Sequence, residues 1–314
     1  MLQEFADWIS YALFGLAKDS HIGAAANFFI YDSIKVTLLL AVIVFIVGVI
    51  RTFITPNKIK KLLGKKREGI GNIFAALLGI PTPFCSCSAV PLFLGFLEAG
   101  VPLGVTFSFL IASPLINEVA AVMLFAMFGW QIALLYVASG FAIAVIAGII
   151  IGRLHLEKEV EKIKCKTRIQ RDEKWNWKER LEFGLSQSKT ITLNVLPYLL
   201  VGIAIGGLIH GYAPQDLLLK IAGTGNFFAV PIAVLIGIPL YSNAAGMVPI
   251  VGVLISKGMG IGTALAFMMS VIGLSLPELI ILRKMLKPKL LIAFVLIMFL
   301  ALVFTGYLFN LILG

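Results

Sequence analysis

Apolar residues fill most of the chain in stretches long enough to cross a lipid bilayer, which takes about 20 residues. Membrane spans are predicted at 33–53, 130–152, 259–282 and 290–312, of which 130–152 is an uninterrupted apolar stretch. Clusters of helix-breaking residues interrupt three more apolar stretches, at 70–98, 102–128 and 227–256. A further span at 190–210 is expected to be interrupted by Asn194 and Pro197. The pattern predicts an all-α polytopic membrane protein with broken helices.

One stretch inside the 70–98 run cannot be a continuous helix facing lipid. It reads GIPTPFCSCSAVP, from Gly79 to Pro91. Pro81 and Pro83 each lack a backbone N–H and clash with the preceding turn. Backbone freed in this way at membrane depth is tolerated only where it is buried in protein or lines a cavity. The stretch therefore predicts a helix break that faces a solute site.

The two halves of the chain repeat each other. Gly79-Ile80-Pro81 recurs as Gly237-Ile238-Pro239, 158 residues later. The same offset relates Val90 and Pro91 to Val248 and Pro249, Gly100 to Gly258, Gly104 to Gly262 and Phe109 to Phe267. An insertion of two residues then places Glu118 opposite Glu278. Matching interrupted segments in two halves are typical of a transporter binding site.

Composition and charge agree with a membrane protein. Hydrophobic residues make up 60% of the chain and charged residues only 13%, with a mean hydropathy of +1.00. A soluble domain would have about 25% charged residues. The net charge of +10 comes from basic clusters at 55–69, 153–189 and 283–289, which flank spans as cytoplasmic segments do. This placement argues against a nucleic-acid partner, and the three cysteines do not form a disulfide framework.

Two membrane topologies are compatible with the apolar pattern. If 70–98 and 227–256 cross the bilayer fully, the chain has eight spans and 153–189 lies on the side opposite 55–69. If both are re-entrant hairpins, six full spans are left and all three basic segments are cytoplasmic. The halves then have opposite orientations and form an inverted repeat. The charge distribution favours the second topology.

The predicted topology divides the chain into four parts. Residues 1–32 contain an interfacial helix, because residues 2–17 are amphipathic at helical spacing. Residues 33–152 form the first transmembrane repeat and residues 190–314 the second. Residues 153–189 form a basic cytoplasmic connector that is partly helical. Each repeat is expected to combine full transmembrane helices with one broken, re-entrant hairpin.

Several motifs resemble a known family. The sequence TPFCSCSAVPLFLGFLEAGVPLG, followed by FLIASPLINEVA, is similar to the signature of the ArsP and YraQ type of predicted permeases, and SLPELIIL in the second half is also similar. The resemblance extends from about residue 35 to the end of the chain. It implies a multi-pass permease of the inner membrane and, for the ArsP branch, export of trivalent organoarsenicals.

The candidate solute site surrounds the CSC motif. Cys85 and Cys87 are soft ligands suited to thiophilic species such as As(III), Cu(I) or Zn. A half-helix that starts here offers free N–H groups and partial positive charge, which favour the thiolate. The other candidate solute-binding residues are Pro83, Ser86, Ser88, Asn117, Ser242 and Asn243. Two thiols do not complete a metal cage, so neither a resident metal nor a cofactor is expected. Alternatively, both cysteines are small packing residues.

Two acidic residues lie within the predicted spans beside helix breaks. Glu118 follows Pro114 and Asn117, and Glu278 follows Pro277. Intramembrane carboxylates are costly and are commonly functional, so both are candidates for proton coupling. Structural hydrogen bonding or a position near the membrane interface is the alternative.

The sequence favours a permease over an enzyme. The proposed activity is transport of a small thiophilic solute across the cytoplasmic membrane, with the bilayer and the solute as partners. The alternatives are transport of a sulfur compound or a metal species, a membrane thiol redox protein that uses Cys85 and Cys87, and a passive channel or assembly subunit. A homo-oligomer is compatible with the sequence.

Overall fold

The computed structural model describes residues 2–13, 15, 20–52, 69–80, 86–98, 100–161, 176–212, 228–240 and 244–313. This part of the chain is helical, apart from turns and a β-bridge between Val160 and Leu286. The prediction of an all-α protein is confirmed. The elements are α1 (Leu2–Asp7), η1 (Trp8–Leu13, a π-helix), α2 (His21–Arg51), α4 (Ile70–Gly79), α5 (Ser86–Glu98), α6 (Leu103–Leu115), α7 (Glu118–Phe128), α8 (Trp130–Arg153), η2 (Glu157–Glu159), α9 (Trp177–Tyr212), α11 (Ala229–Gly237), α12 (Ala244–Ser256), α13 (Ile261–Gly273), α14 (Leu276–Arg283) and α15 (Pro288–Leu313).

Two helices have the length and composition of a membrane span within the described part of the chain, α8 and α15. The helices α6 and α7 meet at a bend of 45° and could together make a third span. These helices confirm the spans predicted at 130–152 and 290–312 and the interruption predicted within 102–128. The complete set of six or eight spans is still a prediction.

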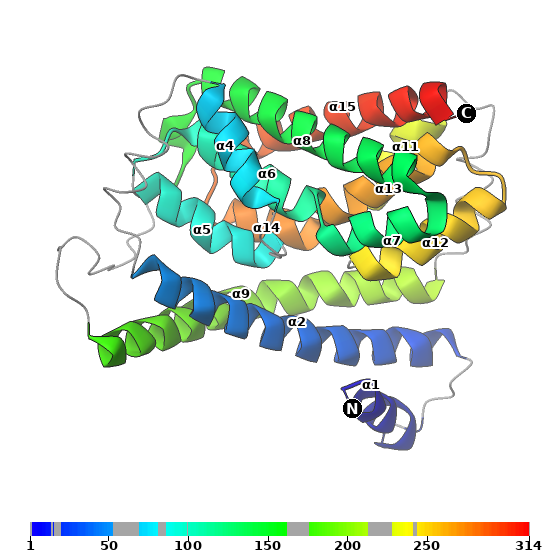
Figure 1. Ribbon diagram of the computed structural model, residues 1–314. Coiled ribbons are helices and arrows are strands. Elements are labelled where there is room, and N and C mark those ends of the chain that lie inside the picture. The colour runs from blue at the N-terminus through cyan, green and yellow to red at the C-terminus, as the bar shows by residue number, and fades with distance from the viewer. Residues whose placement is uncertain are drawn as a thin grey trace.

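The long helices α2 and α9 pack against each other along one side of the bundle (Figure 1). They are antiparallel, because Arg180 Nη1 donates to Thr52 Oγ1 at 2.8 Å while Ser188 Oγ donates to the Ala41 carbonyl at 2.6 Å. α9 continues through Pro197, so the interruption predicted in 190–210 is wrong. A proline removes one hydrogen bond, and helices in membranes tolerate it where neighbouring groups satisfy the freed carbonyl.

The order of the remaining helices repeats along the chain. α12, α13, α14 and α15 begin 158 residues after α5, α6, α7 and α8. The contacts repeat as well: α6 packs on α4, α5 and α8, and α13 packs on α11, α12 and α15. Gly100 and Gly258, at the turns that precede α6 and α13, both have positive φ angles, of 77° and 98°. Only glycine adopts this conformation at no steric cost.

Glycines bring the helices of each half into close backbone contact. A β-carbon placed on Gly104 in α6 would overlap the Gly148 carbonyl in α8. At the matching positions, a β-carbon on Gly262 would overlap the Gly306 carbonyl. Small residues permit such approaches between membrane helices, where apolar burial alone does not hold helices together. The α6–α8 and α13–α15 pairs are therefore the closely packed frame of each half.

One end of the molecule, called here the basic end, gathers the ends of several helices. Thr52, at the end of α2, lies beside Arg180 of α9. Residues 159–161 pair with residues 285–287: the Glu161 N–H donates to the Met285 carbonyl and the Lys287 N–H donates to the Glu159 carbonyl, both at 2.8 Å. The end of α8 and the start of α15 also lie here, on the left of Figure 1. The three predicted basic segments thus adjoin one end of the fold.

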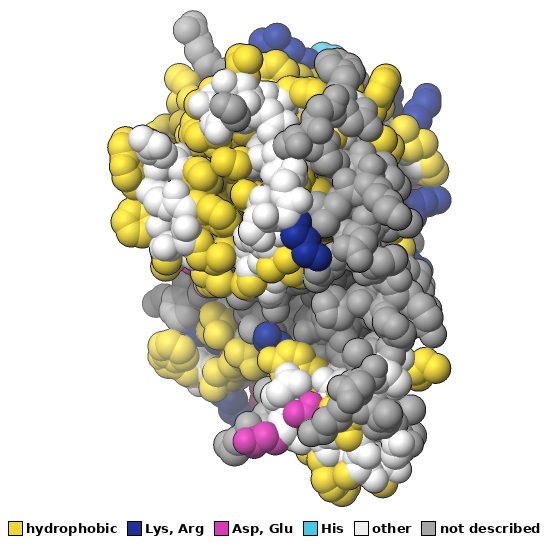
Figure 2. Space-filling view, turned by 90° about the vertical axis from the view of Figure 1, so that its right-hand side faces the viewer, with side chains coloured by type: hydrophobic (Ala, Val, Ile, Leu, Met, Phe, Trp, Pro, Cys, Tyr) yellow, Lys and Arg dark blue, Asp and Glu magenta, His cyan; other side chains and the backbone are white. Residues whose placement is uncertain are grey.

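Helix α1 and η1 lie outside α2 (Figure 1). The Asn27 amide of α2 donates to the Asp7 carboxylate at 2.7 Å and also contacts Ser10, which fixes this segment on α2. Phe5 and Trp8 stack on each other and are exposed. Figure 2 shows the end opposite the basic end, where acidic side chains appear over the lower part of the surface, near α1. The interfacial role of this segment is still a prediction.

Candidate functional site at the helix breaks

The first break, Ile116 and Asn117, separates α6 from α7. Asn117 is in an extended conformation, and its side-chain oxygen accepts hydrogen bonds from Val119 N–H at 2.9 Å and Ala120 N–H at 3.1 Å. An N-cap side chain satisfies amides that have no partner inside the helix. Pro114 lies in the last turn of α6, at the start of this interruption. The break predicted around Pro114 and Asn117 is confirmed, and the Asn117 side chain caps α7.

A tyrosine of α8 satisfies the backbone on both sides of the first break. The Tyr136 hydroxyl donates to the Leu115 carbonyl at 2.7 Å and accepts from Asn117 N–H at 3.4 Å. Tyr136 has no exposed surface, so water does not compete for these groups. A buried backbone group without a partner costs about 1–3 kcal/mol. Tyr136 therefore stabilises the bend and fixes it to α8.

The second break, Leu274 and Ser275, separates α13 from α14, so the single span predicted at 259–282 is wrong in that it is divided into two helices. Ser275 is extended, with φ −67° and ψ 148°, and is buried. The first amide of α14, Leu276 N–H, donates to the Ile238 carbonyl at 2.8 Å. Ile238 directly follows α11, within the Gly-Ile-Pro motif of the second half. This hydrogen bond connects the repeated motif to the second break.

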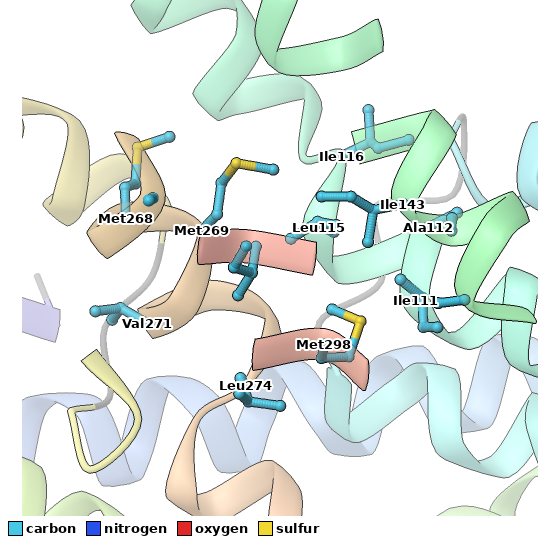
Figure 3. Close-up of a cluster of buried hydrophobic side chains, with 14 of the residues drawn as sticks. Ile111, Ala112, Leu115, Ile116, Ile143, Met268, Met269, Val271, Leu274 and Met298 are labelled. Carbon is cyan, nitrogen blue, oxygen red and sulfur yellow. The ribbon is translucent and has the colours of Figure 1, made fainter. Parts of the chain in front are cut away.

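The two breaks meet in the core of the molecule. A β-carbon placed on Gly273, the last residue of α13, would lie 2.8 Å from Leu115 Cδ1 at the end of α6. Apolar side chains from α6, α8, α13 and α15 fill the space around both breaks (Figure 3), and Leu115, Ile116 and Leu274 are all buried. Polar helix ends thus lie inside an apolar core, where their electrostatic interactions are strong.

Two helical hairpins lead to these breaks. The name hairpin 1 is used here for the pair α4 and α5, and the name hairpin 2 for the pair α11 and α12. α4 ends against α6, because a β-carbon on Gly79 would lie 2.9 Å from Ala112 Cβ and 3.1 Å from Ser113 N. α11 ends against α13 in the same way, with Gly237 beside Ser270. The ends of both first arms therefore lie within a turn of a break.

The second arm of hairpin 1 is fixed to α6 by aromatic pairs. The ring of Phe93 lies edge-on to that of Phe107, with centroids 5.1 Å apart, and Phe96 lies edge-on to Phe109 at 5.0 Å. Such pairs contribute about 0.5–1.5 kcal/mol each beyond the burial of area. They hold α5 in place, and with it the position of its first turn.

In the sequence, the predicted solute-binding residues other than Asn117 lie in the first turn of α5 or shortly before α5 and α12. Ser86, Cys87 and Ser88 are the first three residues of α5. Cys85 directly precedes α5 in the sequence and Asn243 directly precedes α12, at matching positions of the repeat. Pro83, Cys85, Ser242 and Asn243 lie outside the described residues, so the grouping of the thiols with Asn243 is still a prediction. Among described residues, no three His, Cys, Asp or Glu side chains gather as metal ligands.

The two candidate acids lie in the first turns of α7 and α14, but at different positions. α7 and α14 both begin at the common offset of 158 residues, so the expected two-residue insertion is wrong. Glu118 is the first residue of α7 and is exposed, whereas Glu278 is the third residue of α14 and is 1% exposed. The cap positions Asn117 and Ser275 match instead. The helix starts, rather than the acids, determine the alignment of the halves.

A comparison with protein families decides the class. The model of the ArsP_1 family, described as predicted permeases, matches residues 21–311. The chain belongs to this family. The permease is 24% identical to a UPF0718 protein of Methanocaldococcus jannaschii, over 82% of this chain and 87% of the relative. It is 25% identical to UPF0718 protein YraQ of Escherichia coli, over 77% of this chain and 68% of the relative.

A third relative comes from Streptococcus mutans, and its name describes a subunit of a two-component membrane permease complex. The permease is 26% identical to it, over 79% of this chain and 82% of the relative. No solved structure matches the permease. The resemblance found in the sequence is thus confirmed at the level of the family.

The sequence did not identify the groups that form hydrogen bonds at the two breaks, the Tyr136 hydroxyl and the Ile238 carbonyl. Tyr136 stands within an apolar span, 19 residues after Asn117, and its role depends on a contact between α8 and the α6–α7 bend. The matching residue of the second half is Phe294, which has no hydroxyl. A polar residue on only one side of an otherwise matching pair is the signal that could have identified Tyr136 in the permease sequence.

Proposed function

We propose that this permease moves a small thiophilic solute, such as a trivalent organoarsenical, across the cytoplasmic membrane through a site between the tips of its two hairpins. The observation that carries the proposal is the convergence of both hairpins on two adjoining helix breaks. Discontinuous helices at the interface of two repeats are the common form of a transporter binding site. In the sequence, the CSC motif spans the start of α5, which begins at Ser86.

Soft ligand chemistry supports a thiophilic solute. Cys85 and Cys87 carry the two sulfur donors of the motif, and thiolates bind As(III), Cu(I) and Zn in preference to hard ions. Cys87 lies in the first turn of α5, where unpaired N–H groups and the helix dipole favour a negative charge. Asn243, at the matching position before α12, adds a neutral polar ligand. The solute would therefore be held by two thiols on one side and an amide on the other.

Two inverted halves with re-entrant hairpins account for the contacts around the proposed site. α4 begins beside the C-terminal part of α8, near the basic end, since a β-carbon on Gly148 would lie 3.0 Å from Asn72 Nδ2. α11 begins beside the C-terminal part of α15, since a β-carbon on Gly306 would lie 2.5 Å from Val230 Cγ1. Figure 1 places these helix ends on opposite sides of the molecule. The hairpins would thus enter the membrane from opposite faces.

This topology can be tested by chemical labelling. Single cysteines replacing Lys61, Lys166 and Lys287, in a background without native cysteines, are expected to resist an impermeant thiol reagent in intact cells, because the three basic segments lie on the cytoplasmic side. A cysteine replacing Asp216, which lies between α9 and α11 in the sequence, is the external control and is expected to react. Labelling at Lys166 but not at Lys61 would support eight spans and contradict the inverted arrangement.

The thiophilic site is tested by replacing the sulfur atoms. Cys85→Ser and Cys87→Ser are each expected to weaken binding of phenylarsine oxide about tenfold or more, equal to about 1.4 kcal/mol, because serine retains size and capping ability but is a hard ligand. Titration calorimetry on purified protein and uptake into inverted vesicles measure binding and transport.

The third cysteine provides the matched control. Cys165 lies in the connector, away from both hairpins in the sequence. Cys165→Ser is expected to bind and transport as the parent protein does. Should Cys85→Ser and Cys87→Ser also behave like the parent, the two cysteines are packing residues and the organoarsenical proposal fails. A membrane thiol redox role would instead appear as turnover of an electron acceptor that is lost in both variants.

A partner subunit is a further part of the proposal. The Streptococcus mutans relative is named as a subunit of a two-component permease complex, which supports a heteromeric assembly for this permease as well. Native mass spectrometry of the gently solubilised protein distinguishes a monomer, a homo-oligomer and a complex with a second chain.

A further inference from the structure

The second arm of each hairpin packs on a helix of the other half. α5 of hairpin 1 packs on α14, which follows the second break, and α12 of hairpin 2 packs on α7, which follows the first break (Figure 1). α5 and α14 both end at the basic end, because a β-carbon on Gly104, at the start of α6, would lie 2.8 Å from Gly152 Cα and because residues 285–287 pair with residues 159–161. α7 and α12 both end at the opposite end, where α8 and α13 begin. The helices of each pair are therefore parallel.

A contact between α12 and α7 determines how these two parallel helices are aligned. A β-carbon on Gly252 would lie 2.9 Å from Met127 Cε, so these two residues face each other. A spacing of seven residues is close to two turns of an α-helix and returns to the same face. Ala245 and Ala120 lie seven residues before Gly252 and Met127, in the first turns of α12 and α7. The spacing therefore places Ala120 of α7 opposite Ala245 of α12.

The repeat relates this pair of alanines to two residues with different chemistry. The offset of 158 residues relates Ala245 to Cys87 and Ala120 to Glu278. Cys87 is the second residue of α5, and Glu278 is the third residue of α14. Glu278 and Leu282, one turn later, are both buried, so this face of α14 is covered by protein. The alignment of the matching pair assigns this face to the contact with α5.

The two matching contacts differ in polarity. Alanine occupies both positions in the contact between α7 and α12, so packing at this place does not require a polar side chain. The contact between α5 and α14 instead combines a thiol with a buried carboxyl. A carboxyl within a membrane protein is costly to bury and is commonly functional. Only one of the two matching contacts therefore carries groups that can bind a solute.

We infer that Cys87 and Glu278 form one composite solute site across the two halves, with the thiol from hairpin 1 and the carboxyl from α14. This inference rests on the proposed function and adds a carboxyl to its site. The solute bound by the thiol lies beside Glu278, so the acid that is a candidate for proton coupling acts at the solute itself. Glu118 matches Leu276 and lies outside this pair of positions.

Arsenic capture by engineered thiol pairs tests the alignment of α5 with α14. In the full-length protein with Cys85→Ser and Cys165→Ser, Cys87 alone is expected to bind phenylarsine oxide weakly. Adding Glu278→Cys is expected to raise the affinity about tenfold or more, because two thiols then bind one arsenic atom. Two sulfur–arsenic bonds form in this reaction, and the oxygen of the reagent leaves with both thiol protons as one water. Leu279→Cys, at the next position and on a different face of α14, is the matched control and is expected to give no gain.

A second thiol pair tests the same alignment without replacing Glu278. Val90 and Ile281 lie three residues after Cys87 and Glu278, one turn further along both helices. In a protein without native cysteines, Val90→Cys and Ile281→Cys together are expected to bind phenylarsine oxide about tenfold more tightly than either does alone. Titration calorimetry on the purified full-length protein measures both pairs.

The outcomes separate this inference from the proposed function. No gain from Glu278→Cys in a folded protein overturns the inference, as does an equal gain from Leu279→Cys, and transport by the parent protein is then unaffected by the result. If Glu278→Cys does not fold, the pair at Val90 and Ile281 decides by the same criterion. If the pairs bind as expected but the parent protein transports no phenylarsine oxide, the proposed function fails and the arrangement of Cys87 beside Glu278 stands.

Discussion

Replacing Gly148 with alanine is expected to destabilise the permease by about 1–3 kcal/mol, the usual effect of inserting a methyl group into a closely packed core. A β-carbon at this position would overlap Ser108 Oγ and lie 2.7 Å from the Gly104 carbonyl and 3.0 Å from Asn72 Nδ2. Backbone of α6 cannot shift aside without disturbing the Asn72–Ser108 hydrogen bond of 2.9 Å, which joins α4 to α6. The melting temperature in detergent and the yield of monodisperse protein measure this effect.

Gly252 of α12 offers the matched control. It also lies within an apolar helix, but the nearest atom to a β-carbon there is Met127 Cε, at 2.9 Å. This methyl group is the end of a flexible side chain that can turn away at little cost. Gly252→Ala is therefore expected to melt close to the parent protein. Equal melting of Gly148→Ala and the parent would mean that α6 and α8 are not in close backbone contact.

The repeat and the first break could be predicted from the sequence because both depend on local chemistry. Asn117 before Glu118 is an N-cap signal, and Pro114 limits the helix before it. The offset of 158 residues between Gly79 and Gly237 also relates the starts of α6 and α13. Glycines recur at this spacing because both halves bring helices together at the same points. Because both halves need a residue without a side chain at these contacts, glycine occurs at the matching positions.

The hydrogen bonds that stabilise the two breaks could not be predicted, because they join elements that are far apart in the sequence. Nothing near Leu276 in the sequence indicates that its amide binds the Ile238 carbonyl, 38 residues earlier. The same applies to Pro197: its local effect on a helix is unfavourable, yet α9, which packs on α2, continues through it. The alignment of Glu118 with Glu278 was wrong because matching by residue type ignored the caps, which determine where the helices begin.

Replacing Glu278 with glutamine is expected to abolish transport driven by a proton gradient while leaving solute binding within about threefold of the parent. Glu278 is 1% exposed and lies in the first turn of α14, two residues after the amide bound to hairpin 2. Ionisable groups in this setting are costly to bury and are commonly retained for proton or ion movement. Glutamine retains the size and hydrogen-bonding ability of the side chain but does not release a proton. Uptake into proteoliposomes with and without an imposed pH gradient measures the effect.

Glu118→Gln tests the second carboxyl, and Glu157→Gln, in η2 outside the predicted spans, controls for a change of one charge. Glu118 is the exposed first residue of α7, whereas Glu278 is buried, so a smaller loss is expected in Glu118→Gln than in Glu278→Gln. A structural role for Glu278 would lower protein yield and solute binding together, whereas a coupling role reduces only the gradient-dependent rate. Gradient-driven transport at parent rates in both Glu118→Gln and Glu278→Gln would leave the two carboxyls as structural groups and exclude them from coupling.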